Sequence, residues 1–404
     1  MFARYLSTIV LTAALAVAYG HDAALSAAHH FLESTSPKVV LSPTYPSTQL
    51  SSKFEEWKDK FAREYDSLKE EALRKLIWLE NHSLIVKHNE QGRSWSLGHN
   101  DFSDITNEEF KQRFYLGKYS PGIFDAKGRS NGLNSVSTSQ QRKLRGFEEY
   151  LSETEEETLP TVEEDVPESK DWNEEGAVSP VKNQWFCGAC WAFSAVGAIE
   201  GARAIATGNL TALSVQQLID CDQTDLGCGG GLMNNAFEYD ESTDGLCSYE
   251  DYPYALHQHW FDGCSRYLPY CNPVDHSTVK KFVNVTDTED ELKAAIAIQP
   301  VSVAVAAGGT DWQFYSNGVY DGGCNDEIDH GVLAVGYGHY DPADDPNAWT
   351  NATAKDYFKI KNSWGTVWGE EGFIKLARGT GTEEEGGSSC VLKFASRPIM
   401  RKDD

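Results

Sequence analysis

The chain has 404 residues, of which 40% are hydrophobic and 12% aromatic, enough for a buried core and for two or three domains. Its formal net charge of −26 argues against nucleic acid or an anionic membrane as a partner, because both would repel the protein. An acidic working compartment suits this charge better.

Residues 1–20 have the pattern of a secretory signal peptide. Arg4 supplies a positive charge, an apolar run extends from Leu6 to Ala18, and small residues around Gly20 suit a cleavage site. The run is short for a membrane span and no second long one follows, so we expect a soluble product of the secretory pathway. Four N-x-S/T sequons agree with this route, although such patterns also arise by chance: Asn81, Asn209, Asn284 and Asn351.

Residues 21–115 are expected to form a mainly helical domain with an ordered core at 52–115. After a polar arm, apolar residues recur at helical spacing from Phe54 to Tyr65. In a second helical run, six residues spaced three and four apart share one face: Glu70, Arg74, Trp78, Asn81, Ile85 and Asn89. This mixed stripe suits a helix packed against another, with its polar members in buried hydrogen bonds.

The second run and the segment GHNDFSD after it together resemble the inhibitory pro-region of papain-like cysteine proteases of the cathepsin L type. In that family a spaced Glu-Arg-Phe-Asn-Ile-Asn helix precedes a Gly-x-Asn-x-Phe-x-Asp segment. Here Trp78 replaces the family's Phe, and four residues match the segment: Gly98, Asn100, Phe102 and Asp104. An ordinary helical hairpin is the alternative, but chance agreement over ten spaced positions is rare.

Residues 116–165 are expected to be a flexible acidic linker. The stretch from Phe147 to Glu168 holds ten acidic residues and no basic one, so self-repulsion and low hydrophobicity keep it extended. Such a connector is open to proteolytic nicking. We therefore place the activation cleavage site here, near residues 158–168.

Residues 166–404 are expected to form an α+β domain. Helical periodicity runs from Trp191 to Ala206, with Gly208 as a stop, and capping patterns at Ser214 and Thr288 begin two more helices. Strand-like runs follow at residues 301–307, 331–338, 357–361 and 372–377. Helices first and strands later imply two packed halves with a cleft between them.

The stretch QWFCGACWAF, from Gln184 to Phe193, places two cysteines three residues apart. A zinc site would need a second ligand pair, and no further CxxC or HxxxH follows. The stretch instead resembles the motif around the catalytic cysteine of papain-like proteases. DHGVLAVGYG at 329–338 and KNSWGTVWGEEGFIKLARG at 361–379 resemble the family's later motifs. This resemblance covers nearly all of 166–404 and implies a papain-like two-domain catalytic fold, with a helical left half and a β-barrel-like right half, and no cofactor.

The resemblance also implies a role for each matching residue. Amide hydrolysis needs a nucleophile, a proton carrier and a site for the oxyanion. Cys190 is the expected nucleophile, since a helix N-terminus and a nearby imidazolium lower a thiol pKa. His330 is its expected partner, held by Asn362 through the other ring nitrogen and shielded by Trp364. The side-chain amide of Gln184 and the Cys190 backbone N–H would form the oxyanion hole.

Nine cysteines can form at most four disulfides, which leaves one free thiol. The resemblance pairs Cys187 with Cys228, and Cys324 with Cys390. Three connectivities stay open among the other four cysteines: Cys221, Cys247, Cys264 and Cys271. The family typically links the Cys221 position to the region of the last two.

The substrate is expected along a glycine rim and an apolar pocket. Gly230 and Gly231 match the backbone rim that pairs with an extended peptide. Other residues that match substrate-binding positions are Leu232, Met233, Ala304, Ile328, Asp329 and Trp364, with Phe394 as a candidate for the pocket floor. Since the pocket residues are mostly apolar, we expect a preference for a bulky aliphatic or aromatic residue second on the acyl side of the cut bond.

Three features depart from the family pattern. Trp185 stands where relatives have glycine, and residues 339–354 form an acidic insertion. His257 and His259 resemble paired histidines that block the cleft in dipeptide-removing relatives. Their loop is shorter and differently placed, so we interpret it as a surface loop and expect an endopeptidase.

The sequence therefore predicts a secreted or lysosomal cysteine endopeptidase made as a zymogen. In the family the pro-segment lies in the cleft in reverse orientation and acid releases it; here carboxylates of residues 98–104 and of the linker would lose charge. Expected partners are peptide and protein substrates, the chain's own pro-region and cystatin-like inhibitors, with no metal and a monomeric state. The alternatives are a catalytically silent binding protein of the same fold and an enzyme that joins peptides by aminolysis.

Overall fold

The structure is a computed structural model that describes residues 47–114, 166–259, 264, 270–324, 327–345, 348–350, 352–379 and 386–401. The predicted signal peptide, the linker and the sequon at Asn351 lie outside the described residues. The chain divides into two units after Glu55. The first part of helix α3 (Ser47–Lys60) thus stands by itself, and residues from Glu56 onward form the second unit.

Helix α3 ends earlier than the apolar spacing predicts. Ala62 takes a left-handed conformation with φ +48°, which ends a helix, so Phe61 and Tyr65 lie beyond it. The Tyr65 hydroxyl instead donates to Asp104 Oδ2 at 3.0 Å. The predicted helical stripe is therefore wrong in its last two members.

The second predicted helix is confirmed as α4 (Leu68–Asn89), which begins at the capping residue Ser67. Its polar stripe makes the expected hydrogen bonds to the segment that follows. Asn81 Nδ2 donates to the carbonyls of Ser103 and Ile105, both at 3.0 Å, and Asn89 Nδ2 donates to Leu97 O at 2.9 Å. The stripe thus holds residues 97–105 against α4.

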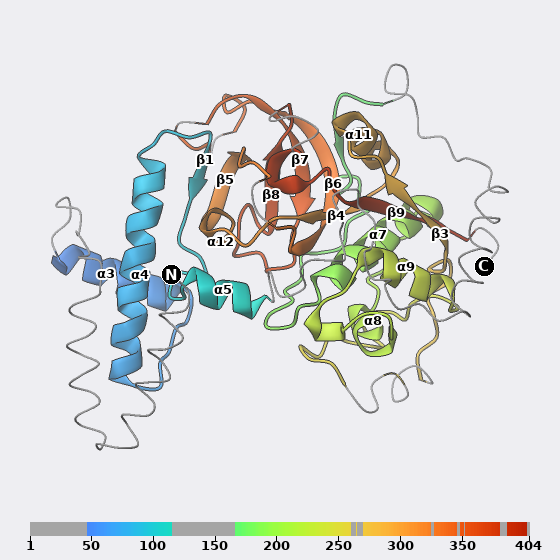
Figure 1. Cartoon of the computed structure of the whole chain (residues 1–404), viewed down its shortest axis with the longest axis horizontal. Coiled ribbons are helices and arrows are strands. Elements are labelled where there is room, and N and C mark those ends of the chain that lie inside the picture. Colours follow the sequence, from blue (N-terminus) through green and yellow to red (C-terminus); the bar gives the residue numbers. More distant parts are fainter. Residues whose placement is uncertain are drawn as a thin grey trace. The chain divides into compact units, whose positions relative to one another are not determined.

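The pro-region extends the sheet of the following domain by one strand. Strand β1 (Trp95–Leu97) pairs antiparallel with β5 (Tyr315–Tyr320), as Figure 1 shows. Opposite Trp95, Gly318 has φ +95°, and a Cβ there would lie 2.4 Å from Ser94 O, so this close approach requires glycine. Helix α5 (Asn107–Arg113) follows, opened by a capping box between Thr106 and Glu109.

Within the described residues, nine strands form one sheet in the order β1-β5-β8-β7-β6-β4-β9-β3, with β2 paired to β6 off this path. The remaining strands are β2 (Lys170–Asp171), β3 (Val279–Val285), β4 (Val301–Val305), β6 (His330–Tyr340), β7 (Lys355–Lys361), β8 (Phe373–Ala377) and β9 (Ala395–Met400). The four predicted strands are confirmed as β4, β6, β7 and β8. Strands β1, β2, β3, β5 and β9 were not predicted from the sequence pattern.

The remaining helices are α7 (Cys190–Thr207), α8 (Val215–Cys221), α9 (Met233–Glu241), α11 (Glu289–Ile298) and α12 (Thr310–Phe314), with 3-10 turns η1 (Gly227–Gly229) and η4 (Ser388–Cys390). Gly208, at φ +71°, ends α7 as predicted. Ser214 and Thr288 cap α8 and α11 as predicted. At both caps the side-chain oxygen accepts the N–H three residues on, which is one half of a capping box. The Gln217 side chain bonds Gly245 O and Cys247 N instead of the Ser214 N–H.

The α+β prediction is confirmed. Helices α7, α8 and α9 gather in one half, and strands β5 to β8 in the other (Figure 1). Helix α7 packs against β6 and is buried over most of its length, and Ser194 Oγ donates to Val332 O at 2.6 Å. None of the helices in the described part of the chain is long and apolar enough to cross a membrane.

The structure joins eight cysteines and leaves Cys190 as the free thiol. The disulfides are Cys187–Cys228, Cys324–Cys390, Cys221–Cys264 and Cys247–Cys271. The last two select one of the three connectivities that the sequence analysis left open.

Candidate active site

Three elements bring the predicted catalytic residues together. Cys190 is the first residue of α7, so its thiol lies at a helix N-terminus, where backbone N–H groups favour negative charge. His330 is the first residue of β6, and Asn362 directly follows β7, the neighbouring strand. Cys190 and His330 line the same pocket.

Asn362 holds the His330 ring. Its Oδ1 lies 2.8 Å from His330 Nε2, and the same oxygen accepts the Ser363 N–H at 2.7 Å. Trp364 stacks on the imidazole with ring centroids 4.7 Å apart and covers this contact. In the described part of the chain no group hydrogen-bonds Nδ1, so this nitrogen remains available to the thiol.

Burial disfavours charge on Cys190 and on His330 in this form of the protein. Burial raises the pKa of the Cys190 thiol to about 11, against the opposing effect of the Gly331 and Trp191 backbone N–H groups. Burial also lowers the pKa of His330 to about 4, although Asn362 opposes this. Desolvation therefore opposes a thiolate–imidazolium pair in this form of the protein, because it disfavours both charges.

The pro-region supplies that burial. Phe114, which follows α5, is 1% exposed, lines the pocket with Cys190 and stacks on Trp364 with centroids 4.9 Å apart. Phe102 and Phe110 meet the same indole edge-on at 6.3 and 5.1 Å. Three pro-region rings thus cover the indole beside His330 and exclude water and substrate.

Polar contacts fix this docking. Asn100 Nδ2 donates to Gln313 O in α12 at 2.7 Å, and Gln313 Nε2 donates back to Phe102 O at 3.1 Å. Trp95 Nε1 donates to Asp321 Oδ1 at 2.8 Å. Two parts of the pro-region, β1 and the loop before α5, are therefore tied to the protease half.

Gln184, the predicted oxyanion-hole donor, is held in one orientation by two hydrogen bonds. Its side chain is fully buried, its Nε2 donates to Cys187 O at 3.1 Å, and its Oε1 accepts the Ser363 hydroxyl at 2.6 Å. These two bonds fix the amide with its N–H groups toward the turn that leads into Cys190. The sequence analysis missed Ser363, whose only signal was its place between Asn362 and Trp364.

The predicted specificity residues surround one pocket. Besides Cys190 and His330, it is lined by Gly230, Gly231, Leu232, Met233, Ala304, Ile328 and Asp329. Trp364 lies next to the pocket, on His330, rather than in its lining. Phe394 packs in the hydrophobic core and is not part of the lining that the structure describes.

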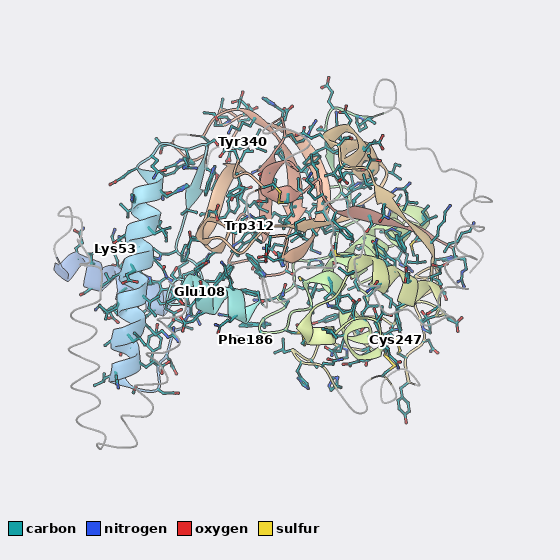
Figure 2. All side chains as sticks on the ribbon, viewed as in Figure 1. Lys53, Glu108, Phe186, Cys247, Trp312 and Tyr340 are labelled. Atoms are coloured by element: carbon teal, nitrogen blue, oxygen red, sulfur yellow. A yellow bond between two sulfur atoms is a disulfide. The ribbon has the colours of Figure 1, made fainter. Side chains whose placement is uncertain are left out.

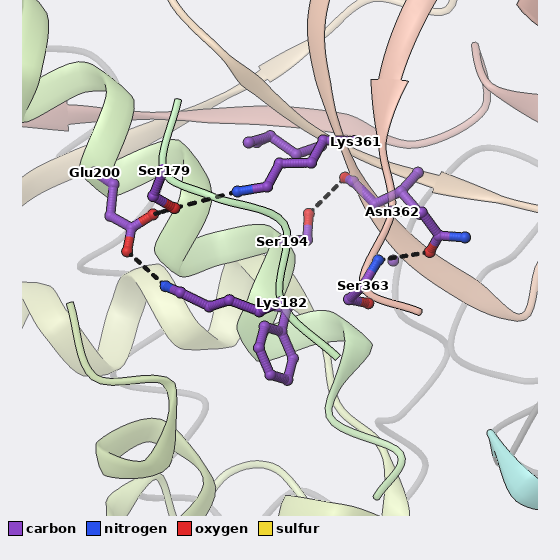
Figure 3. Close-up of a pocket in the computed structure, with 11 residues that line it drawn as sticks. Ser179, Lys182, Ser194, Glu200, Lys361, Asn362 and Ser363 are labelled. Atoms are coloured by element: carbon purple, nitrogen blue, oxygen red, sulfur yellow. Dashed lines mark hydrogen bonds and ion pairs between the residues drawn. The ribbon is translucent and has the colours of Figure 1, made fainter. Parts of the chain in front are cut away.

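A buried charge cluster lies behind the site, and the sequence analysis did not single it out (Figure 3). Glu200 bonds Lys182 at 3.0 Å and Ser179 at 2.6 Å, and Lys361 Nζ donates to Ser179 at 3.1 Å. Burial would raise the pKa of Glu200, but the two lysines outweigh it and lower the pKa. Burial lowers the pKa of Lys361 to about 8. Lys361 precedes Asn362 in the chain, so the cluster holds the strand end that carries it.

The three departures from the family pattern make separate contacts in the structure. Trp185 takes the left-handed conformation that glycine favours, with φ +52°, and its N–H donates to Asn183 Oδ1 at 2.8 Å. In the described part of the insertion, Trp349 donates to Arg93 O of the pro-region at 3.2 Å. His259 bonds Asp220 at 2.8 Å away from the pocket lining.

Two family profiles match the chain. Residues 166–393 match one described as papain family cysteine protease, and residues 54–110 match one described as cathepsin propeptide inhibitor domain. The chain is 40% identical to cysteine protease XCP2 of Arabidopsis thaliana over 351 residues, which cover 86% of each protein. It is 35% identical to vignain of Ricinus communis over 340 residues, 84% of this chain and 83% of that protein.

Solved proforms have the same fold. One is the proform of the ragweed pollen allergen Amb a 11 cysteine protease, with a TM-score of 0.67 and 31% identity over 88% of this chain and 96% of that one. Another is digestive procathepsin L 3 of the Tenebrio molitor larval midgut, with a TM-score of 0.65 and 30% identity over 87% and 99%.

Proposed function

Because the chain belongs to the papain family of cysteine proteases and carries a propeptide inhibitor domain before the protease domain, we propose that it is the zymogen of an endopeptidase whose nucleophile is Cys190. The observation that supports this most is the shared pocket of Cys190 and His330, with the His330 ring held by Asn362 at 2.8 Å.

The geometry supports each step of acyl transfer. With the pro-region gone, water re-enters, and the helix N-terminus favours a Cys190 thiolate paired with a protonated His330. The thiolate attacks the carbonyl carbon, and Gln184 Nε2 and the Cys190 N–H stabilise the oxyanion. His330 donates its proton to the leaving amine, which yields a thioester. Water, deprotonated by His330, hydrolyses the thioester and restores the thiol.

The pocket supports a preference for a bulky apolar residue second on the acyl side. Packing requires glycine at position 231 of this rim, since a Cβ there would lie 2.6 Å from the Trp191 ring. Met233, Ala304 and Ile328 offer an apolar lining.

The localisation that we propose is the secretory pathway, ending outside the cell or in a lysosome-like or vacuole-like compartment. Its disulfides suit an oxidising route.

Acid is the proposed trigger for activation, and the structure offers two acid-sensitive features inside the pro-region. Ion pairs join Arg63 to Asp101 and Arg74 to Glu109, both at 2.9 Å, and protonation of the carboxylates would remove them. The second feature is a pair of stacked histidines. His82 Nδ1 lies 2.9 Å from His99 Nε2, a contact in which one nitrogen must be unprotonated.

The histidine pair leads to a prediction. Wild-type zymogen should process faster at about pH 4.5 than at about pH 7.5, because two imidazolium ions at this distance repel each other. His99→Leu replaces the imidazole with an apolar side chain that cannot gain charge, so processing at mildly acidic pH should slow by about tenfold, the factor that matches one pKa unit. Gel analysis of processing against pH measures this, with the exposed His257→Leu as the control. Equal processing of wild type at both pH values would contradict the proposed acid trigger. A pH profile of His99→Leu that matches wild type would contradict the proposed role of the histidine pair.

Covalent labelling tests the proposed function. The processed protein should react with a peptide that carries an epoxide warhead, and mass mapping should place the adduct on Cys190. The zymogen should label at least tenfold more slowly, because Phe114 covers the thiol and burial keeps it protonated. A processed protein that leaves Cys190 unmodified would be a silent binding homologue rather than an enzyme.

A further inference from the structure

Two exposed aromatic side chains, Trp185 and Phe186, stand next to Gln184 and have no part in the chemistry above. Trp185 is 39% exposed and Phe186 64% exposed, although rings of this size are usually buried. Trp185 also takes a left-handed backbone conformation, which is uncommon for a bulky non-glycine residue. A strained loop that exposes two rings beside the reaction centre indicates a binding surface.

These rings belong to the Trp364 side of the cleft. Gln184 N donates to Ser363 O at 2.8 Å, and Asn183 forms a β-bridge with Trp364, so residues 183–184 run beside 363–364. Trp364 in turn lies on the His330 ring. Because His330 delivers the proton to the leaving amine, this side of Cys190 receives the leaving group, whereas the Gly230–Gly231 rim receives the acyl part.

A cation occupies this surface in the zymogen. The guanidinium carbon of Arg113 lies 4.5 Å from the Phe186 ring centroid and 5.9 Å from that of Trp185. Figure 2 shows Phe186 near the C-terminal end of α5, where Arg113 is the last residue. Arg113 Nε is buried and makes no hydrogen bond to the residues that the structure describes. On the protease side, the aromatic rings of Trp185 and Phe186 therefore contact the Arg113 guanidinium.

The charged residues that act on Arg113 belong to the pro-region, so processing removes them together with Arg113. Asp101, Asp104 and Arg63 act on the guanidinium, and all three lie in the pro-region. After processing, Trp185 and Phe186 remain without their cation. Aromatic faces attract a guanidinium most strongly where water is partly excluded.

We propose that Trp185 and Phe186 form a specificity surface for a cationic side chain, preferentially arginine, on the leaving-group side of the cut bond, and that Arg113 occupies it in the zymogen. The proposal rests on the proposed endopeptidase function and adds a substrate class on the side opposite the apolar pocket. Phe186 carries most of the contact, because its ring is the nearer one.

Quenched peptides that differ only in the first three residues after the cut test the proposal. Processed wild-type enzyme should show kcat/KM about fivefold higher for arginine than for leucine at one of these positions, the range of an exposed cation–π contact. Citrulline, which keeps the shape of arginine without its charge, should behave like leucine. Phe186→Ala should bring the arginine-to-leucine ratio near one, and Phe186→Tyr should preserve it.

Two controls separate this surface from the rest of the molecule. Tyr270→Ala removes another exposed ring, 87% exposed, and should leave the ratio unchanged. Phe186→Ala should also leave the preference on the acyl side unchanged, because a different pocket sets it. The proposal is overturned if wild type shows no arginine preference at any of the three positions, or if the preference survives in Phe186→Ala. If wild type cleaves none of the peptides, the endopeptidase function itself fails.

Discussion

Replacing Cys190 with alanine is expected to lower kcat of the processed enzyme by roughly 10⁵- to 10⁶-fold, the loss seen when a protease nucleophile is removed. All other cysteines are joined in disulfides, so no second thiol stands in for it. The zymogen of this variant should stay intact in acid by itself, yet be cut in its linker when wild-type enzyme is added. Hydrolysis of a fluorogenic peptide and gel analysis of the zymogen measure both effects.

Ser194→Ala is the matched control for the nucleophile. It also removes a small side chain from the first turns of α7, and its hydroxyl bonds Val332 O rather than anything in the pocket. This variant should lose about 1 kcal/mol of folding stability and keep its activity within a few-fold. Self-processing by Cys190→Ala at the wild-type rate would contradict the assignment of the nucleophile.

His330→Ala is expected to lower kcat by roughly 10⁴-fold or more, because both the activation of the thiol and the protonation of the leaving amine depend on one imidazole. Its matched control is His339→Ala on the same strand β6, whose ring is exposed and contacts Asp356 at 2.7 Å. The control should keep wild-type kinetics.

The double variant Cys190→Ala/His330→Ala sharpens this test. Residues that act as one unit give losses that do not add, so the double variant should be about as inactive as Cys190→Ala. Losses that multiply would show that the two residues act independently, and they would contradict the proposed pair.

Local motifs made much of the site predictable. Cys190, His330 and Asn362 each lie in a short motif whose neighbours are set by the chemistry around them, and the structure places all three together at a helix start and two strand ends. Ser363 and the Lys361–Glu200 cluster lacked such a signal. The role of a serine or a buried lysine depends on which residues it contacts in the folded protein, and the sequence does not show these contacts. The missed strands β3, β5 and β9 are defined by pairing across long sequence separations.

The sequence by itself determined the family, the order of pro-region and protease domain, the α+β class and the odd cysteine, because residue type, spacing and count carry that information. Only the tertiary structure decided that Cys247 pairs with Cys271, that Arg113 rests on Phe186, and that burial raises the pKa of the Cys190 thiol. These properties depend on which distant segments meet and on how much water their packing excludes, and neither quantity is local in the chain.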